Sequence, residues 1–158
     1  RKDGGLLSID LPADPPVETE APKALVDAFG VELLYVGKGD FGYIVEVGSE
    51  DAVRDLRPDF ALLGTIPVTG MMVTSVSETD GFDYVARAFA PGSGIDEDPV
   101  TGAAHCCMGV YWTKKLGRPG LRAYQASKRG GVVGVRIEGE RVILTGAAVT
   151  VLKGQLYV

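Results

Sequence analysis

Short runs of apolar and polar residues, separated by glycine and proline, are the main pattern along this chain. Such runs with turn residues between them are typical of strands. They predict strands at residues 6–11, 32–36, 43–47, 71–76, 82–89, 121–126, 132–137 and 142–152. Short helices are predicted at residues 22–29 and 58–63, with a helical turn capped by Ser49. We therefore expect an α+β fold with mainly antiparallel pairing.

One predicted helix, residues 99–116, has apolar side chains around most of its circumference. They are Ala103, Ala104, Cys106, Cys107, Met108, Val110, Tyr111, Trp112 and Leu116. A helix that is apolar on all sides is buried on all sides. Asp98 is expected to cap this helix, Pro99 to begin it and Gly117 to end it. In a strand-rich chain this predicts an antiparallel sheet or barrel wrapped around one central helix.

The composition is that of an ordinary globular domain. The chain has 158 residues, of which 46% are hydrophobic and 23% charged, and these values exclude wholesale disorder. The net charge of −5 argues against nucleic acid as a partner, because phosphate binding needs a basic surface. No apolar run approaches 18 residues, so we expect no transmembrane helix and no membrane partner.

The two cysteines, Cys106 and Cys107, are adjacent and are the only ones in the chain. They exclude a disulfide framework and favour a reducing, cytoplasmic location. With a single histidine they form no zinc pattern, so no metal site is expected. We expect both thiols to be buried and structural rather than catalytic.

The segment from residue 89 to residue 105 is the candidate for chemistry. Gly92 and Gly94 let the backbone bend closely around a ligand. The amides near Gly102 and Ala103 would be unpaired at the start of a buried helix, and such an end binds anions such as a substrate carboxylate. Gly102 also lets a ligand approach without a Cβ in its way. The alternative is that the residues around Asp98 only cap the helix.

Several motifs resemble those of the phenazine-biosynthesis-like (PhzF-like) family. The run RAFAP at residues 87–91 precedes DEDPVTGAAH at residues 96–105, and QASKRGG at 125–131 and GAAVTV at 146–151 follow in the same order. The resemblance implies a diaminopimelate-epimerase-like fold of two similar lobes, each a barrel around one helix, with the active site between them. On this pattern residues 1–18 are the end of the N-terminal lobe and a linker, and residues 19–158 are the C-terminal lobe.

The resemblance also implies a function: cofactor-independent isomerisation by proton transfer on a small carboxylate. The family's acid/base glutamate belongs to the N-terminal lobe, and Asp98 assists from the C-terminal lobe. Gly94, Thr101, Gly102 and Ala103 are then expected to bind substrate, although many members have serine where this chain has Ala103.

The chain is expected to lack the lobe with the glutamate and to be inactive alone. Its expected partners are the substrate, the N-terminal lobe and a second copy in a homodimer. The alternative is a truncated, non-catalytic lobe that acts as a binding or interaction module.

Three further residues have two interpretations each. His105 is either a hydrogen-bonded core residue or a group that lines the cleft. Arg87 and Arg129 either pair with a substrate carboxylate or with Asp96, Glu97 or a neighbouring strand.

Overall fold

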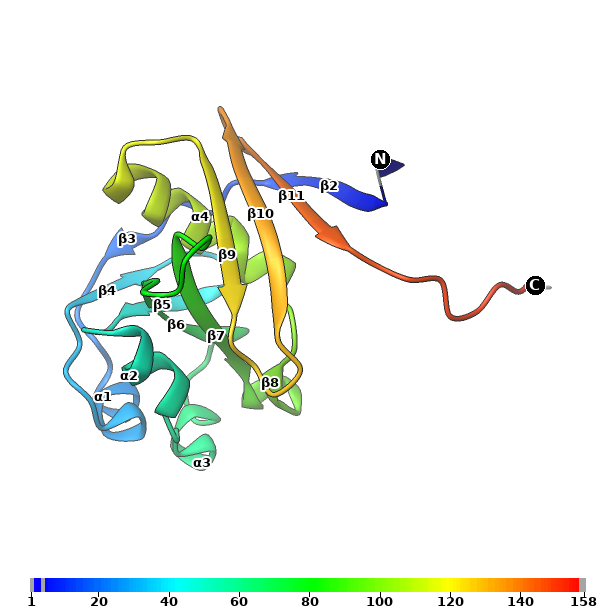
Figure 1. Ribbon diagram of the computed structural model, residues 1–158. Coiled ribbons are helices and arrows are strands. Elements are labelled where there is room, and N and C mark those ends of the chain that lie inside the picture. Colours follow the sequence, from blue (N-terminus) through cyan, green and yellow to red (C-terminus); the bar gives the residue numbers. More distant parts are fainter. Residues whose placement is uncertain (1, 4, 157–158) are drawn as a thin grey trace.

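One large sheet curls around one helix in the computed structural model, which describes residues 2, 3 and 5–156 (Figure 1). The strands are β1 (Lys2–Asp3), β2 (Leu6–Pro12), β3 (Val17–Glu18), β4 (Tyr35–Lys38), β5 (Gly42–Glu46), β6 (Gly70–Val76), β7 (Tyr84–Ala90), β8 (Ile95–Asp98), β9 (Gly120–Gln125), β10 (Gly131–Glu138) and β11 (Arg141–Ala147). The helices are α1 (Lys23–Phe29), α2 (Glu50–Asp55), α3 (Phe60–Leu63), the 3₁₀ turn η1 (Pro91–Ser93) and α4 (Gly102–Leu116).

The described strands pair in the order β1-β2-β11-β10-β9-β7-β6-β5-β4-β3, and β8 pairs with β7 beside this path. The pairs β5–β6 and β7–β9 are parallel and the others are antiparallel. The predicted α+β class with mainly antiparallel pairing is therefore confirmed. Most predicted elements lie within three residues of their predicted ends, but β8 occupies a segment expected to be a loop.

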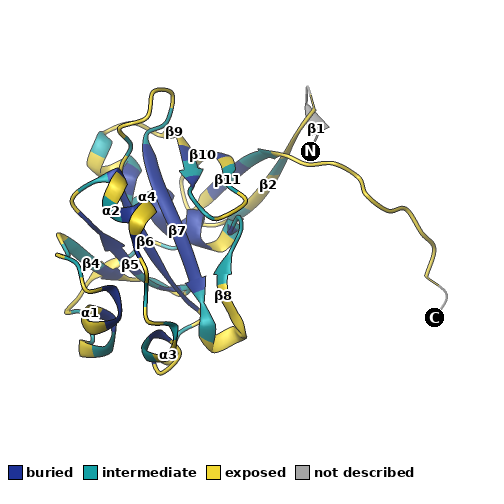
Figure 2. Ribbon diagram, turned by 60° about the horizontal axis from the view of Figure 1, so that its bottom comes forward, coloured by how far each residue is buried: buried dark blue, intermediate teal, exposed yellow. Residues whose placement is uncertain are grey.

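The central strands are buried on both faces (Figure 2). Along β7, Tyr84, Ala86 and Ala88 belong to the core around α4, whereas Val85 and Phe89 belong to a second core under α1, α2 and α3. This alternation follows from the two-residue period of a strand. The sheet therefore has α4 on one face and the three short helices on the other.

The start of α4 differs from the prediction. The helix begins at Gly102 rather than at residue 99, and its N-cap is Thr101 with an extended backbone (φ −114°, ψ 101°). Asp98 is the last residue of β8 and pairs with Ala88 of β7. This pairing keeps residues 95–98 extended, so neither the Asp98 cap nor the Pro99 start is correct. The predicted end is confirmed, because Gly117 follows Leu116 with a φ of 69°.

The predicted burial of α4 is confirmed for its middle, where Ala104 to Gly109 and Trp112 are buried, whereas Ala103 at its start is exposed. Trp112 is fully buried, its ring stacks on Tyr84 with centroids 5.8 Å apart, and its Nε1 donates a 2.9 Å hydrogen bond to Thr74 Oγ1. Gly109 lets the helix lie close to β10, because a Cβ at this position would be only 2.5 Å from Val135 Cγ1. The sheet therefore encloses the helix, as its apolar circumference requires.

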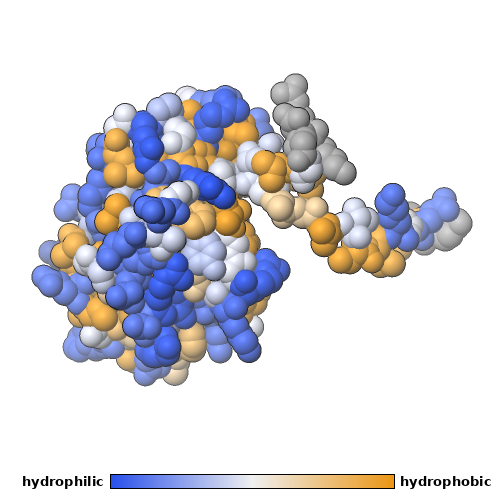
Figure 3. All heavy atoms as spheres, viewed as in Figure 1, coloured by the Kyte–Doolittle hydropathy of each residue, from blue (hydrophilic) through white to orange (hydrophobic). Residues whose placement is uncertain are grey.

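The last predicted strand is shorter than expected. Strand β11 ends at Ala147, and residues 148–156 have no regular structure, so the prediction of a strand to residue 152 is wrong. The apolar residues of this segment are exposed (Figure 3), namely Val149, Val151, Leu152 and Leu156. At the other end of the chain, β2 pairs with β11 along its whole length. Among the described helices, none is long and apolar enough to cross a membrane.

We predict that Trp112→Ala lowers the free energy of unfolding by roughly 3–5 kcal/mol, because it removes a fully buried indole and leaves a cavity. Urea denaturation monitored by circular dichroism measures this change. Lys114→Ala is the matched control, because Lys114 is exposed on the same helix and its loss should change stability by less than about 0.5 kcal/mol. Similar effects of the two variants would contradict an enclosed α4.

Candidate active site

The segment from η1 to α4 contains β8, with a turn before this strand and a bend after it. Gly94 ends η1 with a φ of 80°, which favours glycine, and its amide donates a 2.9 Å hydrogen bond to the Pro91 carbonyl. The chain then runs antiparallel to β7 as far as Asp98. Gly94 and Asp98 therefore lie at opposite ends of β8, and Gly94 is an exposed turn residue.

Asp98 and Thr101 are in direct contact. The Thr101 hydroxyl donates a 2.5 Å hydrogen bond to Asp98 Oδ2, and the Thr101 side chain makes no capping hydrogen bond to the first turn of α4. Gly102 and Ala103 thus supply first-turn amides next to Asp98, and Ala103 is exposed. A Cβ on Gly102 would point to Leu144 of β11, 3.7 Å from its Cδ1.

Gln125 connects β9 to this loop, although the sequence drew attention to it only as part of a motif. Its side chain is completely buried. Its Oε1 accepts a 2.9 Å hydrogen bond from the Thr101 amide, and its Nε2 donates to the Asp98 carbonyl at 2.7 Å and to Thr101 Oγ1 at 3.1 Å. The Gln125 side chain therefore pairs with the backbone of Asp98 and with both the backbone and the side chain of Thr101.

His105 lies one turn inside α4 and is completely buried. Its Nε2 is 3.2 Å from Gln125 Oε1, and its Nδ1 is 2.8 Å from the Tyr84 hydroxyl. Burial lowers the pKa of His105 to about 4, so the ring is neutral at physiological pH. Of the two interpretations, the hydrogen-bonded core histidine is the one that the structure confirms.

The turn between β9 and β10 supports the same loop. Ser127 Oγ donates a 2.8 Å hydrogen bond to the Pro99 carbonyl and accepts one of 3.1 Å from the Gly130 amide. A Cβ at Gly131 would overlap Val100, so the loop packs directly onto the start of β10. Arg129 is exposed on this turn. The motif at residues 125–131 thus contacts and supports the motif at residues 96–105.

Arg87 is a structural partner of Glu97 and does not face α4. Its guanidinium forms a two-point ion pair with Glu97, with Nε–Oε1 at 2.7 Å and Nη2–Oε2 at 3.0 Å. Its Nη1 donates to the carbonyls of Val53 and Leu56 at the end of α2. The interpretation in which Arg87 pairs with its neighbours is therefore correct.

Both cysteines are buried free thiols, as expected. Burial raises the pKa of the Cys106 thiol to about 11 and raises that of Cys107 well above its ordinary value. Neither is therefore a thiolate at neutral pH. Within the described residues, no group of three or more His, Cys, Asp or Glu side chains is placed to hold a metal ion.

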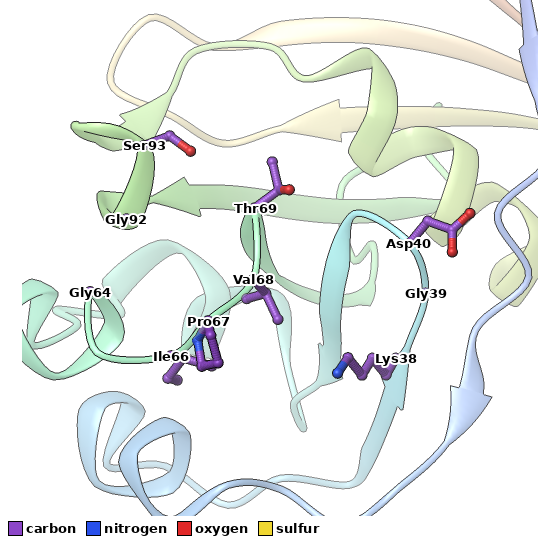
Figure 4. A pocket seen from close by; sticks show the side chains of 10 residues that line it. All are labelled: Lys38, Gly39, Asp40, Gly64, Ile66, Pro67, Val68, Thr69, Gly92 and Ser93. Atoms are coloured by element: carbon purple, nitrogen blue, oxygen red, sulfur yellow. The ribbon is translucent and has the colours of Figure 1, made fainter.

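A surface hollow of about 560 Å³ lies at the end of the sheet where β4 turns into β5 (Figure 4). It is lined by Lys38, Gly39, Asp40, Gly64, Ile66, Pro67, Val68, Thr69, Gly92 and Ser93. Only Gly92 and Ser93 come from the segment discussed above, and Asp98 is not part of the lining. The hollow is therefore not lined by Asp98, and the Asp98 loop stays the candidate active site.

Because His105 is buried and neutral, we predict that the protein loses stability in acid. The unfolded chain protonates His105 near its ordinary pKa of 6.5, whereas the folded chain protonates it near pH 4. Stability is therefore lost as the pH falls from 6.5 toward 4, by about 2 kcal/mol between pH 7 and pH 5. Urea unfolding across this range measures the loss, and no other histidine contributes because the chain has one.

His105→Gln is the control for this effect. The variant starts from a lower stability, because it loses part of the hydrogen-bonded group, but its stability should change little between pH 7 and pH 5. An equal pH dependence in both proteins would show that His105 does not cause the loss.

Comparisons with known proteins point to one family. The family described as "Phenazine biosynthesis-like protein" matches residues 19–154. An uncharacterized isomerase of Halalkalibacterium halodurans is 44% identical over 98% of this chain and 59% of its own length, and one of Pseudomonas aeruginosa is 43% identical over 95% and 57%. The crystal structure of a PhzF-family phenazine biosynthesis protein from Enterococcus faecalis superposes with a TM-score of 0.89 at 32% identity, covering 99% of this chain and 60% of that one.

The chain thus spans about 60% of the length of these relatives. The match extends over most of the chain, and the two sequence motifs at Asp98 and Gln125 meet in one hydrogen-bonded loop. We conclude that the chain belongs to the phenazine biosynthesis-like protein family.

Proposed function

We propose that this chain is the C-terminal half of a cofactor-independent isomerase that moves a proton on a small carboxylate substrate. Residues 19–158 would form its C-terminal lobe, and residues 1–18 would connect that lobe to an N-terminal one. The names of the relatives support the reaction class, since two of them are called isomerases.

The observation that carries the proposal is the position of Asp98. Its carboxylate is partly exposed and is held by Thr101 beside the first amides of α4. Those amides and the helix dipole favour negative charge. In this proposal Asp98 is an acid/base group beside an anion site, and proton transfer next to a carboxylate needs both.

The chemistry follows from this arrangement. A base on the N-terminal lobe, a glutamate by family resemblance, removes a proton from a carbon next to the substrate carboxylate. The charge that develops on the carboxylate oxygens is stabilised by the amides of Gly102 and Ala103. The proton then returns at another carbon with the assistance of Asp98, so the substrate is isomerised with no net gain or loss of protons. Because the base belongs to the other lobe, the 158-residue chain would be inactive alone.

A second candidate function is that of a non-catalytic binding module. Its support is the exposed apolar segment after β11, in which Val149, Val151, Leu152 and Leu156 are each more than 80% exposed. An apolar surface of this kind favours association with another chain, including a second copy in a homodimer. Such a module would bind its partner without turnover.

We predict that Asp98→Asn lowers proton exchange by on the order of 10²-fold, because it removes the proposed acid/base group. The assay follows loss of the proton signal next to the carboxylate in D₂O, over a panel of small carboxylates, with the chain joined to an N-terminal lobe. The oxygen of the asparagine side chain can still accept the Thr101 hydrogen bond, so the loop should keep its structure. Asp96→Asn is the matched control, since Asp96 is exposed on the same strand and should exchange like the parent.

Two outcomes would contradict the proposed two-lobe mechanism. One is exchange at full rate by the 158-residue chain without an N-terminal lobe, which would show that the base does not come from the other lobe. The other is exchange by Asp98→Asn equal to that of the parent, which would leave Asp98 as a structural acceptor only.

We also predict that citrate binds at the amides of Gly102 and Ala103, because this helix start has no side-chain cap. A ¹H–¹⁵N titration should shift these two amides before those of other elements. Ala103→Asp should abolish the shifts by placing a carboxylate in the same position, while stabilising the helix by about 0.3–1 kcal/mol. Citrate shifts that persist in this variant would contradict the site.

A further inference from the structure

We infer that Tyr84, His105, Gln125 and Thr101 are positioning residues that orient the Asp98 carboxylate through a buried hydrogen-bond chain with a single direction of donation. This inference rests on the role proposed above for Asp98. The residues come from β7, α4, β9 and the N-cap of α4, so the chain of bonds joins two neighbouring strands to the start of α4.

The orientation of Gln125 is fixed at two points by the backbone. The Thr101 amide can only donate, so its partner at 2.9 Å must be the Gln125 oxygen. The Asp98 carbonyl can only accept, so its partner at 2.7 Å must be the Gln125 nitrogen. Both contacts require the same orientation of the side-chain amide, and rotating it by 180° would break both.

This orientation determines the histidine tautomer. Because Gln125 Oε1 can only accept, the His105 nitrogen 3.2 Å away, Nε2, must carry the hydrogen. The ring is neutral, so Nδ1 is an acceptor, and the Tyr84 hydroxyl 2.8 Å away must donate to it. Donation therefore runs from Tyr84 to His105 and from His105 to Gln125.

The same direction continues to the carboxylate. The Gln125 nitrogen donates its second hydrogen to Thr101 Oγ1 at 3.1 Å. Thr101 Oγ1 already accepts this bond, so its own hydrogen is directed to Asp98 Oδ2 at 2.5 Å. Each of the four side chains thus donates its hydrogen toward Asp98, whereas the Thr101 amide donates back to Gln125 and fixes its orientation.

The chain of bonds is longer than helix capping requires. Gln125 alone pairs with the Thr101 amide, and an apolar side chain at Tyr84 or His105 would fill the core without a desolvation cost. Tyr84, His105 and Gln125 are each fully buried, so water cannot replace any of the three. These polar side chains are explained if the Asp98 carboxylate must be held in one orientation.

The test begins with the unmodified 158-residue chain, labelled with ¹⁵N. The nitrogen shifts of His105 should report a neutral ring with the hydrogen on Nε2. The opposite tautomer, or a mixture of the two, would overturn the inference without any variant.

The second measurement uses Thr101→Val and Thr101→Ser. Valine has the shape of threonine but no hydroxyl, and serine restores the hydroxyl. Scalar couplings of Asp98 should report one side-chain rotamer in the parent and in Thr101→Ser, and averaged rotamers in Thr101→Val. A single rotamer in all three proteins would overturn the inference, as would failure of serine to restore it.

The third measurement separates this inference from the proposed function. In the protein with its N-terminal lobe, Thr101→Val should lower kcat for proton exchange by about tenfold with KM unchanged, and Thr101→Ser should restore it. If Asp98→Asn reduces exchange but Thr101→Val does not, the positioning chain is rejected and the isomerase proposal stands. If Asp98→Asn has no effect, the isomerase proposal is rejected, whatever the His105 tautomer.

Discussion

Enclosure of α4 by the sheet is the constraint on which the rest of this structure depends. The buried backbone groups of an enclosed helix need polar partners from the protein. At the N-terminus, the buried Gln125 side chain accepts the hydrogen bond of the Thr101 amide. At the C-terminal end, the Gly117 amide donates a 3.0 Å hydrogen bond to the Thr113 carbonyl, and Lys115 Nζ donates one of 2.6 Å to Glu46 Oε1 on β5. Both ends of the helix are thus fixed by polar groups from the surrounding strands.

The two faces of β7 separate structural polar groups from the candidate chemistry. Tyr84 points to α4 and pairs with His105, whereas Arg87 points to the opposite face and pairs with Glu97 and the end of α2. The acidic residues 96–98 are separated in the same way, because they belong to strand β8 and successive side chains of a strand point to opposite faces. Glu97 is used by Arg87, and Asp98 pairs with Thr101 beside the start of α4.

Polar networks inside a protein are specific because each member has few possible partners. In the group around Gln125, two backbone contacts leave one arrangement of donors and acceptors. This group also explains why the two motifs occur together in the sequence. Gln125 pairs with Asp98 and Thr101, and Ser127 pairs with Pro99, so hydrogen bonds join the two segments at several points.

The sequence by itself determined the fold class, the buried central helix and most strands, because alternation and apolar circumference are local patterns that survive folding. Its motifs also identified Asp98 and the start of α4 as the candidate site. Only the tertiary structure decided that Asp98 ends a strand. Asp98 pairs with Ala88 because the chain reverses direction between β7 and β8. It likewise decided that β11 stops at Ala147, because β-propensity alone does not supply a pairing partner. The roles of Gln125 and Tyr84 depend on contacts between β7, β9 and α4, and no periodicity along the chain encodes such contacts.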